Sequence, residues 1–179
     1  DIFSPMDLTE EIGPGYGSLT NEIINTKPRK ILAIEKDKNL HNFLKKKLEL
    51  EKNVKIINDD ILSIIKKNFL EKNVIVYGNL PYNLSTKILT TLITLEKWPP
   101  WYDILILMFQ KEVAERIIAK SKTKEFGRLS VLSNWRLEIK EHFDVSRNCF
   151  YPKPKVDSSI LSFVPKKNNL YKIFCRLRK

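Results

Sequence analysis

The stretch Asn79-Leu80-Pro81-Tyr82 combines groups suited to handling an exocyclic amine. It ends an apolar run, where a proline interrupts a strand and folding alone does not require an amide and an aromatic ring beside it. The side-chain oxygen of Asn79 and the carbonyl of Leu80 can both accept hydrogen bonds from one amino nitrogen. Two such acceptors would draw the nitrogen lone pair out of conjugation and aim it at an electrophilic methyl group, while Pro81 fixes the backbone so that they converge.

Tyr82 adds an aromatic face on which a nucleobase could stack. Stacking contributes about 1–3 kcal/mol per base, which offsets part of the cost of extruding a nucleotide from its helix. No general base is needed, because the methylated nitrogen loses its proton easily, so catalysis would rest on positioning. Taken alone, the same four residues also fit an ordinary Pro-Tyr turn with a buried tyrosine.

A glycine-rich segment, EEIGPGYGSLT at residues 10–20, carries Gly13, Gly15 and Gly17 where a strand should pass into a helix. Glycines at such a junction permit tight turns and let the backbone come close to a ligand. The spacing is G-x-G-x-G, which differs from the G-x-G-x-x-G of dinucleotide-binding loops. By itself this loop fits a structural turn as well as a cofactor site.

Two acidic residues after the next two apolar runs favour an adenosine-containing cofactor. Glu35 lies about twenty residues beyond the glycines, where a carboxylate can bind both ribose hydroxyls. Asp60 follows the third run, where a carboxylate can accept from an adenine amino group. Either acid alone could be an ordinary surface or helix-capping residue. Together with the glycine loop they should line the carboxyl ends of adjacent strands, where ligands bind in such sheets.

Glu11, just before the first glycine, discriminates between cofactors. A carboxylate at that position suits an ammonium group better than a pyrophosphate. S-adenosylmethionine carries such an ammonium, whereas a dinucleotide would be repelled. We therefore expect S-adenosylmethionine as the cofactor.

Short apolar runs that alternate with helix-like stretches should position these residues. Buried, largely parallel strands are predicted at residues 30–35, 54–57, 73–79 and 103–109. Helical spacing of apolar residues predicts helices between them at 18–26, 39–50, 60–69 and 85–95. This order predicts an α/β fold with right-handed crossovers and helices on both faces of the sheet.

The second half of the chain should complete the sheet at one edge. After residue 110 the sequence predicts a helix at 110–120, a polar loop and a shorter helix that begins at Arg128. Strand-like runs at 135–145 and 158–164 should then add antiparallel strands. We expect one catalytic domain over residues 1–165, with residues 166–179 beginning a C-terminal helical domain that is mostly absent.

Composition points to a basic globular protein with a polyanionic partner. The 179 residues include 32 Lys plus Arg against 21 Asp plus Glu, a net charge of +11. Such a balance favours nucleic acid, because each neutralised phosphate releases counterions. A lysine-rich proteome is the alternative explanation of the same composition.

The chain shows no signal for a membrane or a metal. No apolar run approaches the ~18 residues of a membrane span, and the start, which looks cropped, lacks the regions of a signal peptide. Cys149 and Cys175 are too few for a disulfide framework, and with the two histidines they form no metal-ligand spacing. We expect reduced thiols, no metal and a cytoplasmic location.

Several segments together resemble a known family. EIGPGYGSLT, AIEKD, NDDIL and NLPYNLST are similar to the successive motifs of S-adenosylmethionine-dependent adenine-N6 methyltransferases. FQKEVAERI (109–117), FGRLSV (126–131) and FYPKPKVDSSI (150–160) resemble the small-subunit ribosomal RNA adenine dimethyltransferases. The macrolide-resistance methyltransferases share only part of this set. The likeness runs from about residue 10 to about residue 165.

The resemblance implies a Rossmann-like methyltransferase fold and an activity. That activity is dimethylation at N6 of two adjacent adenosines in a loop near the 3′ end of small-subunit rRNA, within a pre-ribosomal small subunit whose maturation it serves. By motif, it assigns cofactor binding to Glu11, Gly13, Gly15, Gly17, Glu35, Asp60 and Asn79. It assigns the target amine to Asn79, Leu80, Pro81 and Tyr82. We expect a monomer.

The resemblance also assigns residues around the target base. Phe150 would cover the second face of the base, opposite Tyr82, although core packing is the alternative for this ring. Candidates for phosphate contact, each of which could alone be a solvated charge, are Lys111, Arg116, Arg128, Lys153 and Lys155.

The N-terminal segment departs from the family pattern. The Gln-containing segment with which the family normally begins is not matched, and MDLTE at 6–10 is a poor strand sequence that lacks the expected apolar run. We therefore assign no function to residues 2–9 and leave open how they connect to the glycine loop.

The sequence alone also fits other activities on the same fold. These are methylation of adenine N6 in DNA or in large-subunit rRNA, and a non-catalytic RNA-binding role in ribosome assembly. A DNA enzyme would be expected to carry a target-recognition domain, and an assembly factor to have lost Asn79, Tyr82 or a cofactor acid.

Overall fold

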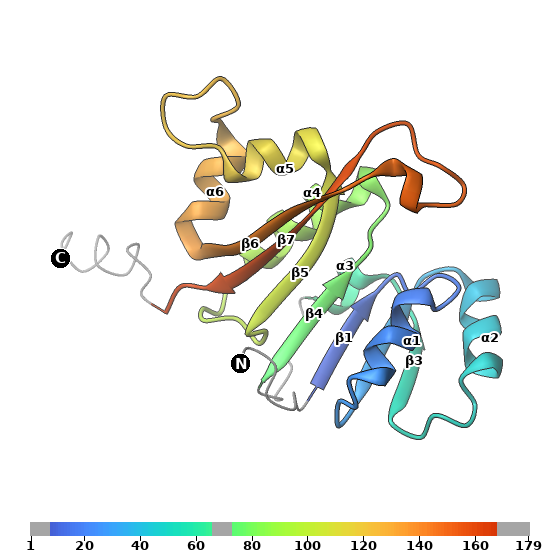
Figure 1. Ribbon diagram of the computed structural model, residues 1–179. Coiled ribbons are helices and arrows are strands. Elements are labelled where there is room, and N and C mark those ends of the chain that lie inside the picture. The colour runs from blue at the N-terminus through green and yellow to red at the C-terminus, as the bar shows by residue number, and fades with distance from the viewer. Residues whose placement is uncertain (1–7, 66–72, 168–179) are drawn as a thin grey trace.

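The computed structural model, which describes residues 8–65 and 73–167, forms one seven-stranded sheet with helices on both faces (Figure 1). The sheet order is β3-β2-β1-β4-β5-β7-β6. The strands are β1 Leu8–Ile12, β2 Ile31–Glu35, β3 Val54–Asn58, β4 Val74–Gly78, β5 Ile104–Gln110, β6 Leu137–Val145 and β7 Ser158–Pro165. The helices are α1 Ser18–Asn25, α2 Lys38–Lys47, α3 Ile61–Ile64, α4 Tyr82–Ile93, α5 Lys111–Ile118 and α6 Arg128–Arg136, with a 3₁₀ turn η1 at Arg147–Cys149.

The expected architecture is confirmed. Strands β1 to β5 pair in parallel, and β7 joins β5 and β6 in antiparallel fashion at the edge that the sequence predicted. Helices α3 to α6 pack together on one face, while α1 and α2 lie over the other face beside β1 to β3 (Figure 1). No helix within the described ranges is long and apolar enough to cross a membrane.

The central strand β1 corrects an expectation from the sequence. Residues 6–10 look like a poor strand, yet Leu8–Ile12 is buried at all five positions and pairs with both β2 and β4. Hydrogen bonds on both sides hold a strand in place even where its sequence includes Thr9 and Glu11. The strand runs directly into the glycine loop, so residues 8 and 9 support the site, whereas residues 1–7 lie outside the described part.

Helix boundaries differ from expectation in ways that matter for the site. The helix predicted at 85–95 begins three residues earlier, at Tyr82, with Pro81 as its extended N-cap. Proline is tolerated at the start of a helix because its missing N–H would have no partner there. The helix predicted at 60–69 is described only as α3, and the predicted C-terminal helical segment from 168 on lies outside the described residues.

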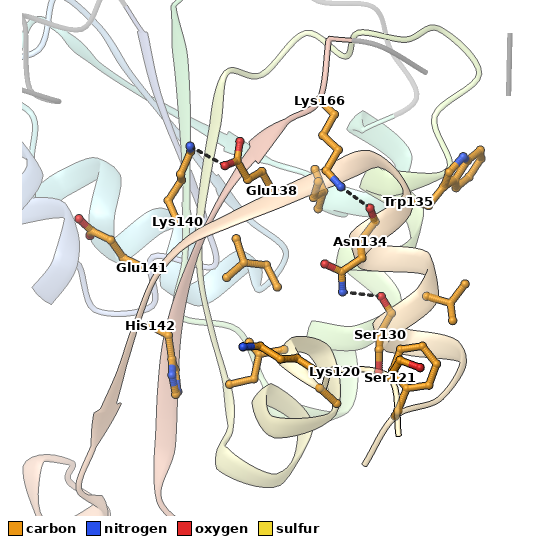
Figure 2. Close-up of a pocket in the computed structure, with 16 residues that line it drawn as sticks. Lys120, Ser121, Ser130, Asn134, Trp135, Glu138, Lys140, Glu141, His142 and Lys166 are labelled. Carbon is orange, nitrogen blue, oxygen red and sulfur yellow. Dashed lines mark hydrogen bonds and ion pairs between the residues drawn. The ribbon is translucent and has the colours of Figure 1, made fainter. Parts of the chain in front are cut away.

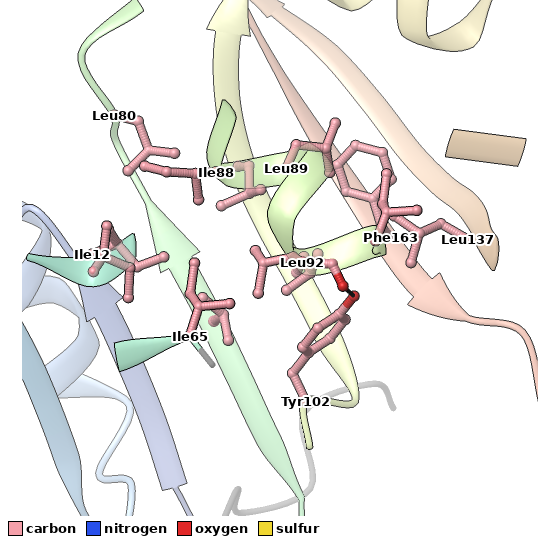
Figure 3. Packing of buried hydrophobic residues seen from close by; sticks show 14 of the residues in the cluster. Ile12, Ile65, Leu80, Ile88, Leu89, Leu92, Tyr102, Leu137 and Phe163 are labelled. Atoms are coloured by element: carbon pink, nitrogen blue, oxygen red, sulfur yellow. Dashed lines mark hydrogen bonds between the residues drawn. The ribbon is translucent and has the colours of Figure 1, made fainter. Parts of the chain in front are cut away.

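The main core lies between the sheet and α4 (Figure 3). Ile88, Leu89 and Leu92 of α4 are almost fully buried, and the hydroxyl of Tyr102 donates to the carbonyl of Leu92 at 3.2 Å. Leu80 belongs to the same cluster and is 3% exposed. The turn that leads from β4 into α4 is thus anchored in the core at its second residue.

Candidate active site

The glycine loop, residues 13–17, joins β1 to α1 in a conformation that suits glycine. Gly13, Gly15 and Gly17 have positive φ angles of 67°, 58° and 80°, in the region that residues with a Cβ rarely adopt. A Cβ at Gly17 would come within 2.7 Å of Leu44 Cδ2, so this glycine lets α1 start close against α2. Around Gly13 and Gly15 a Cβ would meet nothing within 4 Å, which leaves the backbone of the loop open to a ligand.

Glu35 ties the glycine loop to the end of β2. Its Oε2 accepts from the backbone N–H of Gly15 at 3.1 Å, and its Oε1 accepts from the backbone N–H of Asp37 at 2.8 Å. The side chain is buried, but each carboxylate oxygen can still accept a further hydrogen bond. The structure therefore brings Glu35 and the loop together, as the sequence predicts, with acceptor capacity left for hydroxyl groups.

Glu11 is a buried carboxyl group whose hydrogen bonding is incomplete. Its pKa is raised to about 7, chiefly by burial; the Thr20 side chain acts in the opposite direction, and the nearby Glu35 charge contributes a smaller increase. Its Oε2 has no hydrogen-bond partner among the described residues. A buried, incompletely paired carboxylate is stabilised by an approaching cation. Together with the open glycine loop, this fits a cofactor that carries a positively charged group.

Asp60 has protein partners already. It caps α3 by accepting from the backbone N–H of Leu62 at 2.9 Å, and it forms a 2.9 Å ion pair with Lys36. The hydrogen bond from Lys36 and then that from Leu62 hold its pKa below the usual value. From the sequence, Asp60 could either cap a helix or bind the cofactor. These contacts establish the capping role only.

The turn Asn79-Leu80-Pro81-Tyr82 follows β4 at the same edge of the sheet. Asn79 is exposed and Leu80 is buried in the core, so the side chain of Leu80 fixes the position of its own carbonyl. The carbonyl of Pro81 accepts from Leu84 and Ser85 at 2.9 and 3.1 Å and so starts α4. At Gly78 a Cβ would lie 2.9 Å from Leu107 Cδ2, which explains a glycine immediately before the turn.

All five predicted target residues line one cavity, which we call the target cavity. It measures about 200 Å³, large enough for one flat base, and it is lined by Asn79, Leu80, Pro81, Tyr82 and Phe150 together with Met108, Tyr151, Pro152 and Pro154. Phe150 follows η1 and is half-buried, so its ring is not simply core packing. The structure thus unites segments about seventy residues apart in sequence, as the prediction requires.

A second space, the apolar cavity, adjoins the first and measures about 470 Å³. It shares Asn79, Met108 and Phe150 with the target cavity, and it reaches Leu19 of α1, just beyond the glycine loop. Sequence analysis missed Met108, although its alternation along β5 with Ile106 places both on this face. It also missed Ser158, whose hydroxyl lies 2.7 Å from that of Tyr82.

The candidate phosphate contacts fall into two groups. Lys111 is paired with Asp144, which raises the pKa of Lys111, and Arg116 is paired with Glu112. The other three are exposed and have no ion pair among the described residues: Arg128, Lys153 and Lys155. Lys153 and Lys155 lie on the loop that carries Phe150, beside the target cavity. These three are better placed to meet a polyanion than the two paired residues.

A further cavity, which we call the distal groove, lies elsewhere and is larger than these two. It measures about 830 Å³ and runs between α6, the loop after α5 and the first half of β6 (Figure 2). The backbone carbonyl of Asn134 accepts from Lys166 at 2.6 Å, and Lys140 pairs with Glu138 at 2.8 Å on its walls. None of the predicted site residues lines it. Within 8–65 and 73–167 no three metal-ligating side chains come together.

Known proteins match this sequence along nearly its whole length. The model of the family "Ribosomal RNA adenine dimethylase" matches residues 4–177. A ribosomal RNA small subunit methyltransferase A from Pelagibacter ubique is 47% identical over 171 residues, covering 93% of this chain and 64% of the relative. The protein of the same name from Bradyrhizobium diazoefficiens is 40% identical over 167 residues, covering 91% and 59%.

Solved structures also align with most of the chain. A dimethyladenosine transferase from Plasmodium falciparum aligns with a TM-score of 0.78 and 30% identity, covering 94% of this chain and 59% of that one. The 23S rRNA methyltransferase ErmE aligns with a TM-score of 0.73 and 27% identity, covering 93% and 64%. The chain therefore spans about three-fifths of the length of these relatives.

Proposed function

The chain belongs to the ribosomal RNA adenine dimethylase family, and from this premise we propose that it methylates small-subunit rRNA. Methyl groups pass from S-adenosylmethionine to the N6 atoms of two adjacent adenosines in a loop near the 3′ end, giving N6,N6-dimethyladenosine. The substrate is a pre-ribosomal small subunit, and the modification serves its maturation. The observation that carries the proposal is the target cavity, in which Asn79, Leu80, Tyr82 and Phe150 meet.

The target residues act by positioning the amine. An extruded adenine lies between the rings of Tyr82 and Phe150, and its N6 donates to the side-chain oxygen of Asn79 and to the carbonyl of Leu80. Both hydrogen bonds localise the lone pair of N6 and fix its direction. Burial of the Leu80 side chain and the N-cap position of Pro81 fix the Leu80 carbonyl and the backbone that carries Asn79, so little backbone reorganisation is needed at the moment of transfer.

The cofactor residues lie at the neighbouring strand ends. S-adenosylmethionine, when bound, supplies an electrophilic methyl group on a sulfonium. The buried carboxylate of Glu11 attracts the positive charge, the backbone of Gly13 and Gly15 borders the ligand, and Glu35 accepts from ribose hydroxyls. Asp60 accepts from the cofactor adenine with the lone pairs that its cap and its ion pair leave free.

The surroundings of the site suit an RNA substrate. Arg128, Lys153 and Lys155 contact phosphates, and the net charge of +11 strengthens the encounter. Residues 1–165 form the catalytic domain, and residues from 166 on begin a helical domain. The protein acts as a monomer in the cytoplasm.

Methylation of large-subunit rRNA is the second candidate, because ErmE shares the fold at 27% identity. The higher identity to small-subunit methyltransferases, up to 47%, favours the first. The test is incubation of the protein with methyl-labelled S-adenosylmethionine and unmethylated small subunits, large subunits or duplex DNA, followed by mapping of the label. Label on two adjacent adenosines of the small subunit supports the proposal. Label only on large subunits or DNA refutes it, and cofactor binding without transfer to any of them indicates a non-catalytic role.

A further inference from the structure

A hydrogen bond joins Tyr82, which lines the target cavity, to a residue just behind the loop that carries Phe150. The hydroxyl of Tyr82, the first residue of α4, lies 2.7 Å from the hydroxyl of Ser158, 76 residues further along the chain. Ser158 is fully buried and is the first residue of β7, directly after the loop that carries Phe150. The bond therefore links Tyr82 to the start of the strand that follows the Phe150 loop.

Ser158 is held firmly by its neighbours. In the sheet it lies opposite Gln110 of β5 and Val145 of β6. The adjacent Asp157 accepts from the backbone N–H of Lys111 at 3.0 Å through its carbonyl, and from that of Arg147 at 2.9 Å through its side chain. A hydroxyl fixed from two strands and a loop is a rigid reference point for a ring that can otherwise rotate about two side-chain torsions.

We propose that Ser158 is a positioning residue, whose hydroxyl holds the Tyr82 ring in the orientation that leaves room for one flat base opposite Phe150. The inference rests on the proposed function of the target cavity and adds a residue to it. Ser158 does not touch the substrate in this account and acts only through Tyr82. Without the bond, the Tyr82 ring rotates into or away from the cavity, and the base is stacked in several orientations of which few direct N6 at Asn79.

Two substitutions break the same bond from opposite ends. Ser158→Ala and Tyr82→Phe should each slow single-turnover methyl transfer about three- to tenfold, the range that one hydrogen bond accounts for. The double variant should be no slower than either single one, because there is only one bond to lose. Affinity for S-adenosylmethionine should stay within twofold of the wild type in all three. Tyr82→Phe removes one oxygen atom at a half-buried position, so it keeps the test informative should Ser158→Ala fold poorly.

Ser159→Ala is the matched control. Ser159 is the next residue of β7 and is equally buried, but its hydroxyl donates to Asp144 Oδ1 at 2.6 Å and not to Tyr82. Its loss should leave the methyl-transfer rate within twofold of the wild type. Equal slowing by Ser159→Ala and Ser158→Ala would show a general weakening of β7 and would overturn the inference.

A spectroscopic readout separates this inference from the proposed function. Protein labelled with 3-fluorotyrosine should give a ¹⁹F signal for Tyr82, assigned by its absence in Tyr82→Phe. Ser158→Ala should shift or broaden that signal, and Ser159→Ala should leave it in place. If the wild type transfers no methyl group, the proposed function fails whatever this spectrum shows. If transfer occurs but Ser158→Ala leaves both signal and rate unchanged, or if the double variant multiplies the two effects, the positioning role fails.

Discussion

Two halves of the site are built in different ways. The cofactor half, which comprises Glu11, the glycine loop, Glu35 and Asp60, comes from adjacent strand ends within 50 residues of chain. Glu35 accepts from the backbone N–H of Gly15 in the loop and from that of Asp37, just after β2. The target half, Asn79–Tyr82 with residues 146–158, joins two distant segments through the hydrogen bond between Tyr82 and Ser158. The first half is a local construction and the second depends on the antiparallel edge of the sheet.

The halves also differ in charge. On a chain with a net charge of +11, the cofactor half gathers three acids, of which Glu11 and Glu35 are buried. The target half carries the exposed Lys153 and Lys155. A cationic cofactor and a polyanionic substrate would thus meet fields of opposite sign at neighbouring subsites. This difference predicts that substitutions will separate cofactor binding from RNA binding, and it can be tested in each half.

The largest effect is expected at Asn79, where the halves meet. Asn79→Ala removes one of the two acceptors for N6 and should slow methyl transfer by about 10²-fold or more, as loss of one preorganised hydrogen bond does in other enzymes. Cofactor affinity, measured by calorimetry, should fall far less than the transfer rate, because Glu11, the glycine loop and Glu35 still bind the cofactor. Asn83→Ala, an exposed change on the first turn of α4, should behave as the wild type. Unchanged turnover in Asn79→Ala would discard the mechanism.

Glu11 should make stability depend on pH. Because burial raises the pKa of Glu11 from 4.5 to about 7, the folded protein keeps a proton that the unfolded chain has released between those values. The free energy of unfolding should therefore fall as pH rises from about 4.5 to about 7, by about 3 kcal/mol from this group. Glu11→Gln should flatten that part of the profile in urea titrations of the cofactor-free protein.

The exposed Glu22→Gln on α1 is the control for Glu11→Gln and should leave the pH profile as it is. Glu11→Gln should also weaken S-adenosylmethionine binding at pH 8 roughly tenfold, since a charged contact is lost. If Glu11→Gln changes neither the pH dependence of stability nor the affinity for S-adenosylmethionine, Glu11 does not bind the cofactor.

Phe150 should affect the target half alone. Phe150→Ala removes one stacking face and should lower methyl-transfer efficiency about tenfold, consistent with the contribution of one base–aromatic contact. Cofactor affinity should not change. Phe126→Ala, which removes a ring of the distal groove that is 40% exposed, provides the comparison and should leave transfer unaffected. Equal losses in the two variants would argue against a special role for Phe150.

The smallest effects are expected for the basic residues. Lys153→Ala and Lys155→Ala should each reduce the slope of log affinity against log salt for RNA by about 0.7 to 1. Lys111→Ala should change it less, because Lys111 is paired with Asp144. Salt titrations of RNA binding by the three variants test this order, and a larger effect at Lys111 would reverse it.

The contrast between the halves also explains what sequence could predict. The parallel strands, the antiparallel edge and the glycine loop follow from local patterns, and the structure has them where expected. Strand β1 looks like a poor strand in the sequence because its side chains are partly polar. Its stability comes from pairing with β2 and β4 on both sides. The capping of α3 by Asp60 could be predicted only as an alternative to cofactor binding, because the same carboxylate can serve either role.

The target half is harder to read from sequence. Motif resemblance placed Tyr82 and Phe150 at one base, and the target cavity brings them together. The bond between Tyr82 and Ser158 could not be foreseen, because it depends on the register of β7 against β5, which no local pattern specifies. The side chains that complete the two cavities, such as Met108, are ordinary strand residues whose role is visible only when the faces of the sheet are known.

The most direct test of the account is a crystal structure with a bisubstrate ligand, an adenosine whose N6 is joined by a short carbon linker to the 5′-thioadenosine part of the cofactor. The account predicts N6 within about 3 Å of both the Asn79 side-chain oxygen and the Leu80 carbonyl, with the ring between Tyr82 and Phe150. The cofactor part should lie along the glycine loop beside Glu35. A target adenine bound in the distal groove, or with N6 turned away from Asn79, would contradict it.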